Sequence, residues 1–213
     1  MGARAVVFDF NGTLSQDEPI LCEIFQELFA EQGKPLSAQE YFDQLAGLSD
    51  PEIVRTWLGR DHPAVDEVIE ERVRRYRAAA ADGSTVPEEI RAVVRYAAER
   101  VPVAVVTGAA RAEVEPIVAA AGLSAAISAI VSADDIEHGK PDPEGYERAL
   151  AALGAIAPSD AVAIEDTEAG VVSAKGAGMR VVAVLGTLAP ERLAQADELV
   201  DRIDVPLMQR LLE

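Results

Sequence analysis

Short apolar runs alternate along the chain with longer stretches whose apolar residues have helical spacing. An apolar run of four to six residues that ends at turn residues is typical of a strand buried on both faces. We predict such strands at residues 5–10, 101–106, 126–131, 161–164 and 181–185, and helices at 87–100, 111–121, 143–153 and 168–176. This alternation is typical of βα units, so the predicted fold class is α/β, with a Rossmann-like three-layer core around a parallel sheet.

The segment between the first two predicted strands is longer than a crossover requires. It contains no strand pattern, and its apolar spacing predicts helices at residues 20–31, 38–45, 51–58 and 65–81. Because one helix is enough to connect two parallel strands, the excess predicts an inserted helical module. We therefore predict a catalytic core of residues 1–14 and 83–213, interrupted by a helical module of residues 15–82.

The overall charge of the chain argues against some classes of binding partner. With a formal net charge of −18 at pH 7, the chain is not expected to bind nucleic acid or an anionic membrane surface. A single cysteine, Cys22, cannot form an internal disulfide, and no apolar stretch has the length of a signal peptide or a membrane span. These features predict a cytoplasmic protein without a membrane partner, either a monomer or a small homo-oligomer.

Polar residues that could take part in binding or catalysis follow four of the predicted strands. They are Asp9 with Asn11, Thr107 with Gly108, Lys140, and Glu165 with Asp166. In open α/β sheets ligands bind outside the carboxyl ends of the strands, so this placement predicts a common site. Each residue alone is equally explained by capping of a turn or helix, or by a solvated loop charge. Their occurrence at successive strand ends favours the site.

This set of residues suits phosphoryl transfer. An aspartate such as Asp9 can attack phosphorus and form an aspartyl phosphate, which divides one difficult displacement into two easier ones. A magnesium ion between Asp9 and Asp166 would offset the repulsion of two neighbouring carboxylates. Thr107, the backbone amides after it and Lys140 would then hold the phosphate oxygens.

Four segments, FDFNGTL, VVTG, GKPDP and EDTEAG, resemble the four ordered motifs of the haloacid dehalogenase superfamily. The resemblance implies that Asp9 is the nucleophile, that Asn11 supplies a backbone carbonyl to magnesium, and that Glu165 and Asp166 complete the metal site. It also implies that Thr107 and Gly108 bind phosphate and that Lys140 balances the charge. The helical insertion then corresponds to the family's cap, of the type inserted after the first motif.

Asn11 departs from the pattern of the family's phosphatases, which usually carry a second aspartate at this position as general acid and base. An amide cannot deliver or accept a proton at neutral pH. Three explanations stay open: another group transfers the proton, the protein binds phosphate with little turnover, or the reaction differs. Because Gly12 follows, deamidation of Asn11 to aspartate is a further hypothesis.

We expect magnesium-dependent hydrolysis of a small phosphorylated metabolite, with a weakly active phosphate-binding protein as the alternative. A phosphonate or haloacid hydrolase and a sugar-phosphate mutase are less favoured. Lys34 is the only lysine of the inserted module and Arg55 its nearest candidate for a second phosphate. The arginines of residues 72–77 are interpreted as a solvated helix face, and Arg111 as a weak candidate for substrate contact.

Overall fold

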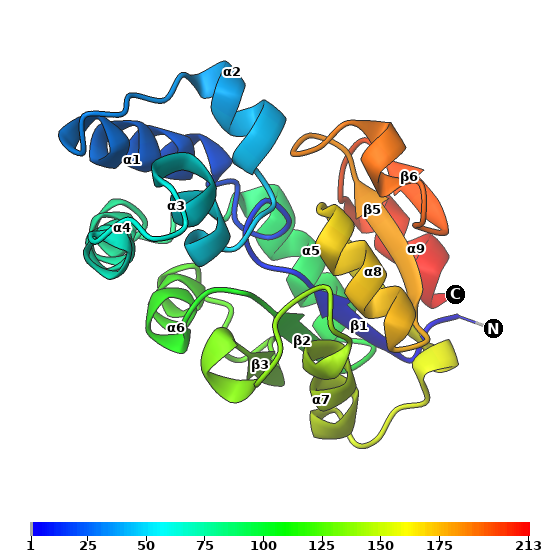
Figure 1. The fold of residues 1–213 in the computed structure, drawn as a ribbon. Helices are drawn as coiled ribbons and strands as arrows, with labels where there is room; N and C mark the ends of the chain where they lie inside the picture. Colours follow the sequence, from blue (N-terminus) through cyan, green and yellow to red (C-terminus); the bar gives the residue numbers. More distant parts are fainter. Residues whose placement is uncertain (1) are drawn as a thin grey trace.

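The five predicted strands and one further strand form a parallel sheet in the computed structural model, which describes residues 2–213 (Figure 1). The strands are β1 (Ala5–Phe8), β2 (Val103–Val106), β3 (Ala129–Val131), β4 (Ala161–Glu165), β5 (Arg180–Val184) and β6 (Glu198–Val200). Their order in the sheet is β3-β2-β1-β4-β5-β6, and each neighbouring pair is parallel. The α/β fold class is therefore confirmed, and β1 and β4 occupy the centre of the sheet.

Helices cover both faces of this sheet. They are α5 (Glu88–Ala98), α6 (Arg111–Ala120), α7 (Glu144–Ala152), α8 (Glu168–Gly176) and α9 (Val205–Leu212). The connection to β2 and the connection from β4 to β5 run in opposite directions along the sheet, so right-handed crossovers place α5 and α8 on opposite faces. Helix α7 packs beside α8, and α9 packs against α5. These helices form the two outer layers.

The residues between β1 and α5 form helices and no strand. They are α1 (Glu18–Glu31), α2 (Ala38–Glu40) with a following π-helical turn (Tyr41–Leu45), α3 (Asp50–Leu58) and α4 (Val65–Ala79). Helix α4 packs against both α1 and α3, and Figure 1 shows this group gathered at one side of the sheet. The division into a core of residues 1–14 and 83–213 and a cap of residues 15–82 stays a prediction, and residue 1 lies outside the described residues.

The C-terminal part of the chain contains elements that the sequence pattern did not predict. Strand β6 is three residues long, and its middle residue Leu199 is exposed, so it lacks the continuous apolar run of the inner strands. Helix α9 begins after Asp204, whose side chain accepts a hydrogen bond from the Leu207 amide at 2.9 Å. Short 3-10 turns complete the structure at Ala133–Asp135, Pro158–Asp160 and Pro190–Leu193.

The inner strands are apolar because they are enclosed on both faces. All residues of β1 are 0% exposed, and β2 and β4 are buried along their whole length. Burial of this kind contributes roughly 25 cal/mol per Å² of apolar area and fixes the strands against one another. Within the described residues, no helix has the length and apolarity required to cross a membrane.

Candidate active site

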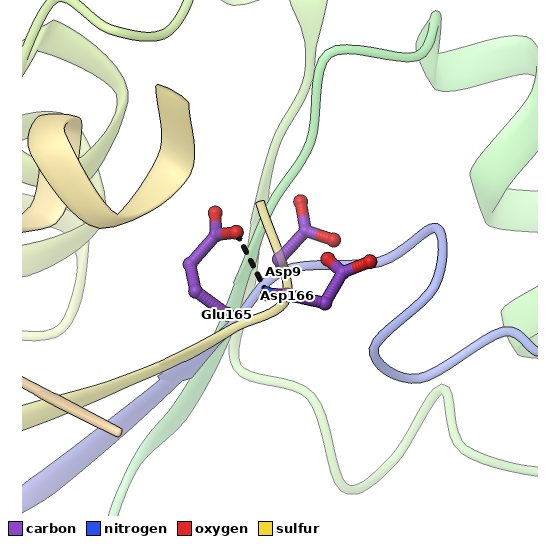
Figure 2. Close-up of side chains that lie close together, drawn as sticks. All are labelled: Asp9, Glu165 and Asp166. Carbon is purple, nitrogen blue, oxygen red and sulfur yellow. Dashed lines mark hydrogen bonds between the residues drawn. The ribbon is translucent and has the colours of Figure 1, made fainter. Parts of the chain in front are cut away.

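The register of the central strands brings the predicted acidic residues together. Phe8 of β1 lies opposite Ile164 of β4, and the Asp9 amide donates to the Ile164 carbonyl at 2.9 Å. Asp9 therefore leaves β1 where Glu165 and Asp166 leave β4. Ligand oxygens of these three carboxylates lie within 4.8 Å of one another (Figure 2). The structure places the acidic residues of the first and fourth motifs in a single cluster.

Asp166 is completely buried and is held by two hydroxyl groups. Thr13 donates to Oδ1 at 3.1 Å, and Thr187 donates to Oδ2. A side chain at Gly12 would be strained, because a Cβ atom would lie 2.0 Å from Asp166 Oδ2 and the Gly12 φ angle is +75°. Gly12 thus allows the loop after β1 to approach the Asp166 carboxylate closely.

Lys140 reaches the cluster from the loop before α7. Its ammonium group forms ion pairs with Asp9 and with Glu165, the latter at 2.6 Å, and donates to the Val106 carbonyl at 3.2 Å. Glu165 is completely buried, and its Oε1 also accepts from the Tyr146 hydroxyl at 2.7 Å. Lys140 therefore joins the third motif to the first and the fourth.

The second oxygen of Glu165 is also satisfied within the protein. Glu165 Oε2 accepts from the Asp166 amide at 3.1 Å, drawn as the dashed line in Figure 2, and from the Thr167 amide and hydroxyl. Gly170 lies over this carboxylate, where a Cβ atom would be 1.8 Å from Oε1. Each Asp166 oxygen accepts one hydroxyl, whereas Glu165 accepts hydrogen bonds from Lys140 and Tyr146 on Oε1 and three more on Oε2. Glu165 is therefore suited to hold Lys140, and Asp166 is the freer of the two as a metal ligand.

Burial and charge determine the protonation of the cluster. Burial raises the pKa of Asp9 to about 7, although the neighbouring Lys140 charge acts in the opposite direction. Burial, followed by the charges of Asp9 and Glu165, raises the pKa of Asp166 well above its usual range. Burial lowers the pKa of Lys140, but the charges of Asp9 and Glu165 more than offset this and raise it. Lys140 is therefore a permanent cation.

The donor set fits a hard divalent cation. Two buried carboxylates, Asp9 and Asp166, face one another, and within residues 2–213 Asp166 has no cationic partner. A buried carboxylate without a cation is costly unless it is protonated or binds a metal. Carboxylate oxygens are the ligands that magnesium and calcium prefer. A cation next to these two groups would return both to the ionised form.

The second motif lies on the neighbouring strand. Phe8 pairs with Val105 of β2, so Thr107 leaves β2 next to Asp9. The Thr107 hydroxyl accepts from the Ala109 amide at 3.0 Å and lies 3.4 Å from Asn11 Oδ1, to which it donates. Thr107 is buried, whereas Gly108 is exposed. The predicted phosphate-binding residues therefore lie at the same strand edge as the acidic cluster.

The side chain of Asn11 is oriented by a buried carboxylate that the sequence analysis did not identify. Asn11 Nδ2 donates to Asp17 Oδ2 at 2.8 Å and lies 3.3 Å from the Tyr76 hydroxyl. Tyr76 also donates to Asp17, and the Gly12 amide donates to Asp17 Oδ1 at 3.2 Å. An aspartate at position 11 would place two carboxylates in contact. The amide at Asn11 is therefore matched to Asp17.

A cavity of about 460 Å³ reaches the acidic cluster at Asp9, whereas Glu165, Asp166 and Thr107 are not among the residues that line it. Asp9, Asn11, Gly108 and Lys140 line it from the sheet side, while residues of α1, the π-helical turn and α3 line it from the inserted segment. The size is that of a small-metabolite site. Neither Lys34, Arg55 nor Arg111 is among its lining residues.

The interpretation of residues 72–77 as a solvated face is wrong for Arg72. Its side chain is 7% exposed, lines the cavity, and forms ion pairs with Asp50 of α3 and Glu113 of α6. Helical spacing alone could not reveal this, because its partners lie 22 and 41 residues away. Arg74 and Arg75 do pair with Glu71 at the surface, as a solvated face predicts. Arg72 is the basic residue of the cavity that sequence reasoning missed.

Comparison of the sequence with known proteins finds one matching family model and relatives that are named as phosphatases. The sequence model described as haloacid dehalogenase-like hydrolase matches residues 6–184. Validoxylamine A 7'-phosphate phosphatase of Streptomyces hygroscopicus subsp. limoneus is 33% identical over 213 residues, covering 92% of each chain. Fructose-1-phosphate phosphatase YqaB of Escherichia coli (strain K12) is 28% identical, covering 84% of this chain and 95% of its own.

The fold has a close counterpart among solved structures. The crystal structure of CbbY from Rhodobacter sphaeroides in complex with phosphate has a TM-score of 0.82 and 28% identity. The match covers 94% of this chain and 95% of the CbbY chain, so it includes the inserted helices as well as the sheet.

Proposed function

The chain belongs to the haloacid dehalogenase-like hydrolase family, and we propose that it hydrolyses a small phosphomonoester through an aspartyl phosphate at Asp9. The observation that carries this proposal is the position of Asp9: a buried carboxylate at the floor of the cavity, paired with Lys140 and adjacent to Asp166. Relatives named as phosphatases support the same reaction class.

The reaction divides into two displacements. In the first, an Asp9 carboxylate oxygen attacks phosphorus and the bond to the leaving alcohol oxygen breaks, so the phosphoryl group is carried on Asp9. In the second, water attacks the aspartyl phosphate, releasing inorganic phosphate and the free carboxylate. Lys140 stays charged throughout and offsets the negative charge that develops beside Asp9. Thr107 and the Gly108 amide are proposed to hold the transferred phosphoryl group.

We propose magnesium as the bound cation, held by Asp9, Asp166 and the backbone carbonyl of Asn11. When bound, it would supply positive charge that stabilises the phosphoryl oxygens. Glu165 is assigned to holding Lys140, because it already pairs with that cation and accepts four further protein hydrogen bonds. This arrangement assigns a separate task to each of the three clustered carboxylates.

The substrate is proposed to be the monophosphate of a small polyhydroxylated alcohol. The cavity volume of about 460 Å³ accommodates such a molecule. Arg72, the basic residue that lines the cavity from the inserted side, is already paired with Asp50 and Glu113, so among residues 2–213 that side offers a second phosphate no free cation in the cavity lining. Two relatives are named for phosphates of this type, validoxylamine A 7'-phosphate and fructose 1-phosphate.

We propose that residues 15–82 act as a cap that excludes water from this cavity.

A phosphate-release assay tests the proposal. The native chain and the Asp9→Asn variant are compared on validoxylamine A 7'-phosphate, fructose 1-phosphate and 4-nitrophenyl phosphate, with magnesium and with a chelator. Removal of the nucleophile is expected to reduce release by roughly 10³-fold or more. Glu23→Gln, an exposed carboxylate on α1, serves as the matched control and is expected to retain native activity. Equal activity of the native chain and Asp9→Asn would show that Asp9 is not the nucleophile.

Asn11 favours a second candidate, a phosphate-binding protein with little turnover. That protein would bind inorganic phosphate and magnesium but release no phosphate from any of the three esters. Isothermal titration of the native chain with phosphate, run beside the release assay, separates the two candidates. Binding without release would support the second one.

A further inference from the structure

The proposed hydrolysis requires a group that protonates the leaving alcohol. Asn11 occupies the place where the family's phosphatases usually carry a carboxylic acid, and an amide cannot perform this transfer at neutral pH. Asp17, the nearest carboxyl group to Asn11, is completely buried and does not line the cavity. The missing proton donor therefore has to be sought among the other groups that line the cavity.

Most titratable groups of the cavity are already engaged. Asp9 is the proposed nucleophile, and Lys140 is paired with Asp9 and Glu165. Asp50 is paired with Arg72. Asp9 is needed as the nucleophile, and Lys140 and Asp50 are engaged in ion pairs, so none of the three is free to exchange a proton with the leaving alcohol.

Two further carboxylates lie at the exposed rim. Glu52 caps α3, where it accepts hydrogen bonds from the Ser49 amide at 3.0 Å and hydroxyl at 2.6 Å. Glu137 is exposed in the loop after β3. Water competes for both groups, so neither provides the enclosed environment in which general acids work best.

Glu18 combines the required properties. It is the first residue of α1, follows the loop that carries Asn11, and lines the same cavity as Asp9. It is partly buried, and within residues 2–213 no cation pairs with it. The Tyr41 hydroxyl donates to Oε2 at 3.0 Å, which orients the carboxyl group. A carboxyl group that is oriented, enclosed and free of a cation can exist in both protonation states.

The charged groups around Glu18 reinforce this behaviour. Burial, then the neighbouring charge of Asp17, raises the pKa of Glu18 to about 7, with a smaller contribution from Asp50 of α3 and an opposing one from the Tyr41 hydrogen bond. Cys22 of α1 and Asp166 at the end of β4 also lie within electrostatic range. The pKa of an effective acid and base lies near the working pH, and that of Glu18 does.

We propose that Glu18 is the general acid and base of this enzyme, in place of the residue at position 11. The inference rests on the proposed function. In the first displacement, the bond from phosphorus to the leaving oxygen breaks and the Glu18 carboxylic acid gives its proton to that oxygen, so a neutral alcohol departs. In the second, the Glu18 carboxylate takes a proton from the attacking water as its oxygen bonds to phosphorus. Asp9 is released and Glu18 is again protonated.

Two substrates with different leaving groups test this role. The alkyl substrate is whichever of fructose 1-phosphate and validoxylamine A 7'-phosphate the native chain hydrolyses faster, and the second substrate is 4-nitrophenyl phosphate. An alkoxide must be protonated as it leaves, whereas 4-nitrophenolate leaves without a proton. Glu18→Gln is expected to lower kcat/KM for the alkyl phosphate by roughly 10² to 10⁴-fold. The nitrophenolate burst of the same variant is expected to keep its rate within about tenfold.

The same variant has a predicted pH signature. In the native chain, kcat/KM for the alkyl phosphate falls as pH rises through about 7, because Glu18 loses the proton that it must donate. Glu18→Gln removes this alkaline limb. After the burst, turnover of 4-nitrophenyl phosphate slows, because no base assists water, and the phosphoenzyme accumulates. A purely structural effect of the substitution would slow the burst as well and leave the shape of the pH profile unchanged.

Several outcomes would overturn the inference. Equal losses for the two substrates would do so, as would a retained alkaline limb, or a selective loss in Glu137→Gln instead of Glu18→Gln. Glu23→Gln on the same helix is the control for a general effect of charge removal. If Asp9→Asn abolishes activity while Glu18→Gln does not distinguish the substrates, the inference fails and the proposed function stands. If Asp9→Asn is as active as the native chain, both fail.

Discussion

The two sides of the cavity are built in different ways. On the sheet side, Asp9, Lys140 and Asp166 come from strand ends or the loop before α7, and parallel register places them beside one another. On the inserted side, Glu18 and Arg72 come from helices whose packing brings together residues far apart in the chain. A strand that is buried on both faces appears in a sequence as an apolar run, whereas the packing partners of a helix do not appear in its sequence. The gathering of these strand-end residues is therefore predictable from the sequence, and the contacts made by Glu18 and Arg72 are not.

The largest effect is expected on the sheet side. Lys140→Met would leave Asp9 and Glu165 without a cation, with side chains only 9% and 0% exposed. Removing one partner of such a buried pair costs about 3 to 5 kcal/mol of unfolding free energy. Urea unfolding at pH 8 measures this cost. A loss below about 1 kcal/mol would contradict the assignment of Lys140 as the ion that holds the cluster together.

A smaller effect is expected for the ion pairs on the inserted side. Arg72→Met leaves Glu113 buried, but Asp50 is 20% exposed and can gain water, so we expect about 3 kcal/mol, the lower end of the range. Arg74→Met on the exposed face of the same helix is the control, with less than about 0.5 kcal/mol expected. If Arg72→Met cost more than Lys140→Met, the contrast between the two sides would be wrong.

Magnesium is expected to raise the unfolding free energy of the protein by binding to the carboxylates on the sheet side of the cavity. At a concentration about 100 times its Kd, a ligand that binds only the folded state adds about 2.7 kcal/mol. Thermal unfolding with and without magnesium would detect this gain in the native chain. Asp166→Asn is expected to remove the gain, while Glu52→Gln at the cavity rim should keep it. An equal gain in Asp166→Asn would contradict the proposed ligand.

The contact between Asn11 and Asp17 gives a prediction about the residue that departs from the family pattern. Asn11→Asp would set two carboxylates against one another, at a position where the amide nitrogen now lies 2.8 Å from Asp17. We expect a loss of about 2 kcal/mol at pH 8 and a smaller loss at pH 5, where one carboxyl group is protonated. The exchange Asn11→Asp with Asp17→Asn should restore most of the stability. A stable Asn11→Asp single variant would mean that Asp17 does not select the amide.

The smallest effect that we expect is the change in unfolding free energy for each pH unit in the metal-free protein. Burial raises the pKa of Asp9 to about 7 and raises the pKa of Asp166. Because the Asp9 carboxyl of the unfolded chain ionises near 3.8, the stability that its folded-state proton contributes is complete below that pH and declines until the pH reaches about 7, and Asp166 acts in the same direction. The expected slope is up to about 1.4 kcal/mol per pH unit for each proton lost. Urea unfolding between about pH 4 and pH 7 in a chelator should show the decline, and magnesium should abolish it.

The differences between the two sides of the cavity also explain which parts of the structure could be predicted from the sequence. The inner strands were predictable because each is a continuous apolar run, and the order of the motifs after them indicated one site. Strand β6 was missed because it is short and Leu199 is exposed. Arg72 was misinterpreted, and Asp17 passed over, because only tertiary contacts distinguish a buried charge from a solvated one. No spacing rule connects Asn11 with Tyr76, 65 residues away.

The formation of an aspartyl phosphate at Asp9 is the central claim of this account. Native protein mixed with the substrate it hydrolyses and quenched within one turnover can be treated with borohydride, which reduces an acyl phosphate to an alcohol. Peptide mass analysis should then find this reduction at Asp9 and at no other carboxyl group. Reduction at another residue, or at none while phosphate is being released, would contradict the account.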